Sequence, residues 1–262
     1  MIGSHYQDTL IAPGFMERAP FQHFRADEFP TMHPVHWLHS HFAVGGWSPL
    51  QRLSGMLTAH MTSIAPHNGF TWHPHRGLEI YTWVLEGTLY HEDTTGGKGL
   101  IRAGELQRMF AGDYIEHQEL NRSDDLARVI QIWFLADAKY KSLAPHYQQL
   151  TQAELPTYTV DDATVYNLIG DGSPMEQHID GRLSATTVPA DGKLIMELPR
   201  EEEQLFLYVT DGRGQVEYAG RTQPLGQYDV ILATPDAQPA VISADANNAL
   251  HYLSFYLPPF MR

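Results

Sequence analysis

The feature that most constrains this chain is a pair of short segments, each carrying two metal-ligand side chains two residues apart. His73 and His75 form the first pair, and His117 and Glu119 form the second. In an extended strand, side chains two residues apart point to the same face. Strands lying side by side bring facing residues to about 4.5–5.5 Å. The pattern therefore predicts that these four side chains bind one divalent metal inside a β-structure.

The types of ligand leave the identity of the metal open. Imidazole and carboxylate groups together suit Fe(II), Mn, Ni, Cu or Zn. Three histidines and one carboxylate would leave open positions on a six-coordinate ion, which a catalytic centre requires. The competing interpretation is that His73 and His75 are structural, but the second pair at matching spacing favours the metal.

Composition narrows the classes of function. Seventeen Lys and Arg against 31 Asp and Glu give a net charge of -14, and this balance disfavours direct nucleic-acid binding because phosphate contacts need concentrated basic groups. The chain has no cysteine, so disulfides, thiolate nucleophiles and iron–sulfur clusters are excluded. We find no signal peptide and no stretch of about 20 apolar residues. No membrane contact is expected, and the expected location is the cytoplasm.

Short strands and glycine turns alternate along most of the chain. Residues 78–90 and 129–135 are rich in β-branched and aromatic residues, as are 204–209 and 251–256. This rhythm is typical of an all-β barrel or sandwich. Residues 139–154 carry the only helical pattern and are interpreted as a linker.

A weak internal repeat suggests two similar domains. The stretch Tyr208–Gly212 echoes Trp83–Gly87, since each strand ends in an acidic residue and a glycine before a hairpin. The second copy has Leu198–Glu203 where the first has its two histidines. One metal site is therefore predicted, in the first domain.

Several other polar residues compete for a place in the site. On a straight strand, Glu79 would lie roughly 13 Å beyond His75 and could return only through a bend at Gly77. We therefore favour Glu119 as the ligand and Glu79 as a polar residue behind the ligands or in the core. Aromatic neighbours and the lack of an acidic residue favour packing for the histidines of residues 33–41.

The remaining candidate residues near the ligands are predicted to have no part in the site. Solvent exposure is predicted for His91, Gln107 and Glu116, and packing in the interior is predicted for Trp72 and Met109.

Taken together, these motifs resemble the pirin family of the cupin superfamily, including its bacterial quercetinase-type members. The matching segments, in order and spacing, are His73–Glu79, Val84–Gly87, Leu106–Gly112, Ile115–Glu119, Gln131–Trp133 and Phe255–Pro259. The resemblance implies an all-β bicupin fold of two tandem antiparallel, jelly-roll-like β-barrels with a short connecting helix. A metal-binding N-terminal cupin with its arm is expected at residues 1–150, and a C-terminal cupin without ligands at 151–262.

The resemblance also implies a chemistry. The family usually holds iron, which here would be bound by His73, His75, His117 and Glu119, with no organic cofactor. Some members are dioxygenases that cleave flavonols such as quercetin with O₂, and in that scheme Glu119 is both ligand and general base. The alternative is a non-enzymatic iron-binding redox sensor or regulator that acts through protein partners. A different cupin activity, such as isomerisation, would rest on the fold alone.

Overall fold

The structure is a computed structural model that describes residues 19–258 and consists of β-strands and two 3-10 turns. The turns are η2 (Ala26–Glu28) and η3 (Gln152–Glu154). The predicted all-β class is confirmed. No helix in this range is long and apolar enough to cross a membrane.

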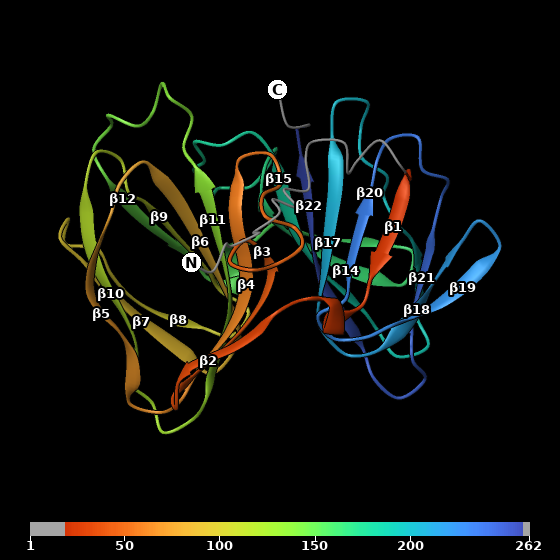
Figure 1. Cartoon of the computed structure of the whole chain (residues 1–262), viewed down its shortest axis with the longest axis horizontal. Coiled ribbons are helices and arrows are strands. Elements are labelled where there is room, and N and C mark those ends of the chain that lie inside the picture. Colours follow the sequence, from red (N-terminus) through yellow and green to blue (C-terminus); the bar gives the residue numbers. More distant parts are fainter. Residues whose placement is uncertain (1–18, 259–262) are drawn as a thin grey trace, which may run out of the picture.

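The first half of the molecule is built from two antiparallel sheets (Figure 1). The seven-stranded sheet has the order β12 (His146–Leu150), β9 (Leu106–Phe110), β6 (Leu78–Glu86), β11 (Ala127–Leu135), β4 (Met56–Ile64), β3 (Leu38–Val44), β2 (Thr31–Val35). The four-stranded sheet has the order β5 (Asn68–His75), β10 (Ile115–Asn121), β7 (Thr88–Asp93), β8 (Lys98–Arg102).

The second half repeats this arrangement of one large and one small sheet. The large sheet has the order β1 (Phe21–Phe24), β20 (Val230–Ala233), β17 (Gln204–Asp211), β22 (Leu250–Leu257), β15 (Arg182–Val188), β14 (Ala163–Ile169), β13 (Thr157–Val160). The small sheet has the order β16 (Lys193–Ile195), β21 (Val241–Ala244), β18 (Gly214–Tyr218), β19 (Arg221–Leu225).

The N-terminal arm connects the two halves. Its strand β1 pairs with β20 of the second half, while β2 joins the sheet of the first half. Residues 1–18 of the predicted arm lie outside the described residues. The division of the chain at residue 150 stays a prediction, although β1 shows that the arm belongs to both halves.

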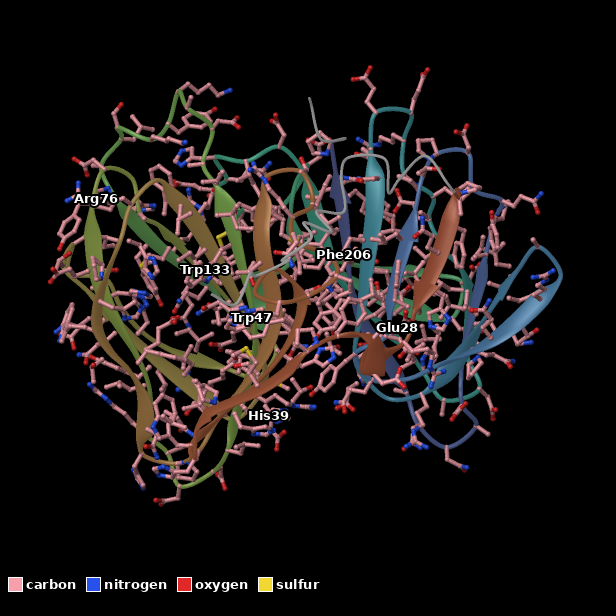
Figure 2. The ribbon with its side chains drawn as sticks, in the orientation of Figure 1. Glu28, His39, Trp47, Arg76, Trp133 and Phe206 are labelled. Carbon is pink, nitrogen blue, oxygen red and sulfur yellow. The ribbon has the colours of Figure 1, made fainter. Side chains whose placement is uncertain are left out.

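The two large sheets pack against each other and form the largest hydrophobic cluster of the described residues. Tyr81 and Trp83 from β6 contribute to this cluster, as do Phe206 and Tyr208 from β17. The next residues along β6, Ile80 and Val84, instead join clusters inside the first half. Because β6 is buried on both faces, its apolar residues occupy adjacent positions instead of strictly alternating, and Glu79 and Thr82 are its buried polar residues. Figure 2 shows Phe206 between the two halves and Trp133 within the first half.

The predicted internal repeat corresponds to equivalent corners in the two halves. Gly87 follows β6 with φ of +70°, and Gly212 follows β17 with φ of +82°. A Cβ at Gly87 would lie 2.3 Å from the carbonyl oxygen of Leu126, and one at Gly212 would lie 2.0 Å from that of Ala249. Both corners therefore require glycine for conformation and for space.

The prediction of a short connecting helix within residues 139–154 is wrong. His146–Leu150 forms strand β12, which pairs with β9, and only the 3-10 turn η3 follows it. The physical reason is tertiary: β9 offers an unpaired edge, and backbone pairing there satisfies more hydrogen bonds than an isolated polar helix of this length.

Candidate metal centre

Strands β5 and β10 are neighbours, as the ligand pattern predicts. His117 lies directly opposite His73, and Ile115 lies opposite His75. The register shifts between His117 and Glu119, so Glu119 faces Phe70 across a β-bulge. The four predicted residues thus lie on two paired strands, but the bulge separates Glu119 from a simple cross-strand position.

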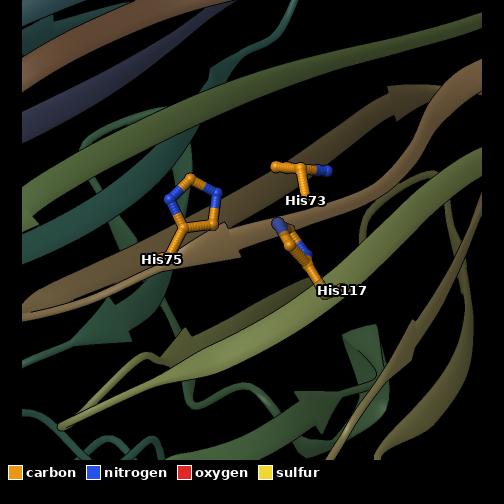
Figure 3. Close-up of side chains that lie close together, drawn as sticks. All are labelled: His73, His75 and His117. Carbon is orange, nitrogen blue, oxygen red and sulfur yellow. The ribbon is translucent and has the colours of Figure 1, made fainter.

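Three of the predicted ligands converge. The candidate ligand atoms of His73, His75 and His117 all lie within 4.8 Å of one another. The ring centroids are 4.3 Å apart for His73 and His117 and 5.0 Å apart for His75 and His117. Figure 3 shows the three rings directed toward a common point from β5 and β10.

The hydrogen-bonding state of these rings fits a metal ion. His73 Nδ1 donates to the carbonyl oxygen of Thr71 at 2.7 Å, so its Nε2 is left without a proton. His75 Nε2 and both ring nitrogens of His117 are buried and have no partner among the described protein atoms. Buried polar atoms are normally satisfied, and a cation bound by bare imidazole nitrogens would satisfy these.

Burial keeps two of the three imidazoles neutral. Desolvation, with contributions from the neighbouring histidines, lowers the pKa of His117 to about 2. Desolvation, with a contribution from His73, lowers the pKa of His75 to about 4. Because a ligating imidazole must be unprotonated, these two rings could accept a cation near pH 7 without first losing a proton.

Glu119 is held by two amide side chains. Gln107 Nε2 donates to its Oε1 at 3.0 Å, and Gln131 Nε2 donates to its Oε2 at 2.7 Å. Trp133 Nε1 donates in turn to Gln131 Oε1 at 2.9 Å, which orients that amide. Glu119 belongs to a second buried group with His91 and His117, whose ligand atoms also lie within 4.8 Å of one another.

A row of polar side chains on the large sheet faces this carboxylate. Gln107, Thr82, Gln131 and His60 occupy directly paired positions on β9, β6, β11 and β4. Desolvation lowers the pKa of His60 to about 4, and the charge of Glu119 opposes that shift. The interior of the first half therefore has a polar layer at the level of Glu119.

Three of the predictions for residues outside the ligand set are wrong. His91 and Gln107 are fully buried rather than exposed, because β7 and β9 turn them toward the interior. A signal for His91 was present in the sequence, since His91 and Asp93 share strand spacing before a glycine turn. Trp72 is 47% exposed and does not pack inside, because its neighbour His73 takes the inward face of β5.

The other residues predicted to lie outside the site largely follow the prediction. Met109 is fully buried, as predicted. Glu116 is partly exposed and accepts a hydrogen bond from Tyr114. His41, from the histidine-rich segment, is buried and bonded to the Tyr208 hydroxyl at 2.9 Å, and His33 stacks on His39. Packing is thus the observed role of these three histidines.

Glu79 lies on the other face of β6, where the two halves meet. It is fully buried, pairs with Arg108, and accepts hydrogen bonds from the Tyr81 hydroxyl at 3.0 Å and the His178 amide at 2.8 Å. Alternation along a strand places Glu79 on the side of Tyr81, away from Thr82 and Glu119. The prediction of a core-polar role is confirmed.

Comparison with known proteins identifies a family model and several relatives. A model of the family described as Pirin matches residues 43–134, which include all four predicted ligands. A "Pirin-like protein" from Solanum lycopersicum is 31% identical over 191 residues, covering 71% of this chain and 65% of that protein. A Pasteurella multocida protein with a provisional quercetin 2,3-dioxygenase name is 36% identical over 136 residues, covering 51% and 58%. The chain thus spans less than two thirds of each of these curated relatives.

Solved structures share the whole arrangement of two halves. The bacterial pirin YhhW from Escherichia coli, in complex with nickel(II), has a TM-score of 0.75 at 25% identity and covers 91% of this chain and 99% of its own. Quercetin 2,3-dioxygenase from Acinetobacter baumannii has a TM-score of 0.74 at 20% identity, covering 92% and 79%. The second likeness concerns the fold alone. The predicted bicupin fold is confirmed.

Proposed function

Because the chain belongs to the pirin family of the cupin superfamily, we propose that it is a metal-dependent dioxygenase of flavonol-like aromatics. His73, His75, His117 and Glu119 would hold one divalent transition metal, with Fe(II) as the native ion. The observation that supports this most directly is the set of buried, unpartnered nitrogens on His75 and His117 beside the bare Nε2 of His73.

The donor set suits divalent first-row transition metals. Three imidazoles and one carboxylate match the ligand preferences of Fe, Ni, Mn, Cu and Zn, and hard oxygen-only cations are disfavoured. When bound, a divalent metal supplies Lewis-acid chemistry that acidifies the hydroxyl of an enolisable substrate.

Glu119 is the residue of this chain placed to accept that proton. Its carboxylate is buried and faces the interior, and two amide donors keep it in one position. The hydrogen bond that Oε1 accepts from Gln107 is longer than the one that Oε2 accepts from Gln131. We therefore assign the incoming proton to Oε1. Gln107 and Gln131 then hold the carboxylate toward the substrate in both protonation states.

The walls near the ligands suit a planar aromatic substrate. Trp133 and His75 form a T-shaped pair with centroids 5.0 Å apart, and Phe42 stacks on His60 at 4.8 Å. These aromatic faces would orient a substrate ring by stacking. The half-buried Trp133 also limits water access on that side of His75.

Metal content and oxygen uptake test the proposal together. The purified protein should contain about one transition metal per chain by elemental analysis and should consume O₂ when quercetin is added. Removal of the metal with a chelator should abolish uptake, and Fe(II) should restore it. A metal-loaded protein that takes up no O₂ with any flavonol would contradict the enzymatic proposal and favour the redox regulator.

A further inference from the structure

A buried histidine–aspartate pair lies directly behind the proposed ligands and has no role in the chemistry described above. His91 Nε2 and Asp93 Oδ2 are 3.0 Å apart, and both side chains are inaccessible to solvent. Strand pairing places Asp93 opposite His117 and His91 opposite Glu119. The pair is thus adjacent to two of the four proposed ligands.

The turn after β7 fixes the carboxylate of Asp93. Its Oδ1 accepts hydrogen bonds from the Thr95 amide at 2.8 Å, the Thr95 hydroxyl at 2.6 Å and the Gly97 amide at 3.0 Å. A Cβ at Gly97 would lie 2.3 Å from Asp93 Oδ2. Glycine at this position therefore leaves room for the carboxylate, and Oδ2 remains to accept from His91.

The ring of His91 is also fixed. It stacks on Tyr147 with centroids 4.5 Å apart, and its other neighbour is His117 at 5.3 Å. With Nε2 donating to Asp93, the neutral ring has no proton on Nδ1. This Nδ1 is buried and has no partner among the described residues, so it is an acceptor without a donor.

His117 is the matching donor. A neutral imidazole carries one N–H, and neither nitrogen of His117 has a partner within the described chain. We propose that the His91–Asp93 pair positions His117, by accepting its ring N–H at His91 Nδ1 and so leaving the opposite nitrogen bare for the metal. The candidate ligand atoms of the two rings lie within 4.8 Å of one another, so the proposal requires the His117 ring to rotate toward His91 when the metal is bound.

This inference rests on the proposed metal site and extends it by one layer. Histidine ligands commonly donate their second N–H to a fixed acceptor, and loss of that acceptor costs roughly 10–100-fold in metal affinity. Here the acceptor would be a second histidine whose own tautomer is set by a carboxylate. His91 and Asp93 are thus positioning residues that touch neither substrate nor metal.

Asp93→Asn is the decisive variant, because it reverses the direction of the chain of hydrogen bonds. Thr95 and Gly97 would keep the amide oxygen of the asparagine at the Oδ1 position, so its NH₂ group would face His91 Nε2. His91 would then carry its proton on Nδ1 and direct it at His117. His117 would then have to accept a hydrogen bond from His91 with one ring nitrogen. The neutral His117 ring would carry its proton on the other nitrogen, and a protonated nitrogen cannot bind a metal.

The test is metal affinity, measured by competition with a chelator using Ni(II) or Fe(II). Asp93→Asn should weaken binding roughly 10–100-fold. The matched control is Glu92→Gln, the adjacent carboxylate, which lies outside the interior layer and pairs with the exposed Lys98. The Glu92→Gln variant loses the same negative charge as Asp93→Asn and should bind the metal as tightly as the wild type. Equal affinity in Asp93→Asn and wild type would overturn the proposal.

Variants of His91 keep the test open if Asp93→Asn does not fold. The amide of His91→Gln can still donate to Asp93 and accept from His117, so this variant should bind the metal nearly as tightly as the wild type. His91→Phe can do neither, so its metal affinity should fall. Electron paramagnetic resonance of the Cu(II)-loaded protein should show the same number of ligating nitrogens in wild type and His91→Phe. One ligating nitrogen fewer in His91→Phe would overturn the proposal by making His91 a ligand. Absence of metal from the wild type would instead contradict the proposed function.

Discussion

The two halves of this molecule share one architecture and differ in what fills their interiors. Inside the second half, β17 contributes Leu205, Leu207 and Val209 to a hydrophobic cluster. The equivalent strand of the first half, β6, places Thr82 between Ile80 and Val84, beside two glutamines and His60 on the neighbouring strands. The fold needs only a buried face, whereas a metal site needs polar groups that other side chains leave unsatisfied.

The candidate metal groups of the described residues all lie in the first half. At the corresponding place in the second half, the segment before β17 carries Leu198 and three consecutive glutamates. The two halves therefore share the same arrangement of sheets, but only the first half has a cluster of candidate metal-ligand side chains among the described residues. The following predictions test that separation of scaffold from chemistry.

Loss of a central ligand should give the largest effect. His117→Ala should lower metal affinity by more than the roughly 100-fold expected for a residue behind the ligands, and it should abolish O₂ uptake. The control is His251→Ala in the second half, where a half-buried histidine contacts Thr187 at 3.0 Å. Elemental analysis should find full metal in His251→Ala and almost none in His117→Ala. Equal metal content in the two would break the comparison.

Loss of the proposed base should separate binding from turnover. Glu119→Ala should keep part of the metal on the three histidines and lose roughly 10²–10⁴-fold in turnover. Glu116→Ala, three residues earlier and partly exposed, should retain both properties. Full turnover of quercetin by Glu119→Ala would remove the assignment of Glu119 as base.

The buried imidazoles should make the metal-free protein sensitive to acid. Burial lowers the pKa of His75 to about 4 and that of His117 to about 2, from 6.5. Below about pH 6.5 these two histidines are protonated in the unfolded chain but stay neutral in the folded chain. The free energy of unfolding therefore falls as pH falls. The melting temperature of the metal-free protein should drop between pH 6.5 and about 4. His117→Leu should show a shallower drop, and an unchanged slope would contradict this account.

The corner glycines should matter equally in the two halves. Gly87→Ala and Gly212→Ala each force an L-residue into a left-handed conformation against a backbone carbonyl, at a cost of about 1–3 kcal/mol. Chemical denaturation should show similar losses of unfolding free energy, and the folded fraction of either variant should bind metal normally. A selective loss of metal in Gly87→Ala would mean that scaffold and site are coupled.

The smallest expected effect concerns the polar layer itself. The hydroxyl of Thr82 is buried without a partner among residues 19–258, whereas that of Thr58 donates to the Val44 carbonyl at 2.9 Å. Thr82→Val should therefore stabilise the metal-free protein by about 1 kcal/mol, and Thr58→Val should destabilise it by a similar amount. Destabilisation by both, measured by denaturant titration, would show that Thr82 has a partner in solution.

Much of the site could be predicted from local sequence, and the errors have one cause. The two pairs His73 with His75 and His117 with Glu119 are visible because strand periodicity is local. The prediction of solvent exposure fails for His91 and Gln107: strand spacing puts His91 and Asp93 on one face, but neither segment shows which strand lies opposite or which face is inside. The face taken by each residue of β7 and β9 follows from pairing with β10 and β6, which are distant in sequence.

The same distinction holds for the fold. Alternating apolar residues and glycine turns determined the all-β class, the repeated corner at Gly87 and Gly212, and the restriction of ligand pairs to the first half. Tertiary structure alone decided that β1 crosses to the second half, that residues 146–150 pair as a strand, and that a bulge lies between His117 and Glu119. A side-chain pattern records which face is buried, but register and neighbour depend on hydrogen bonds between distant strands.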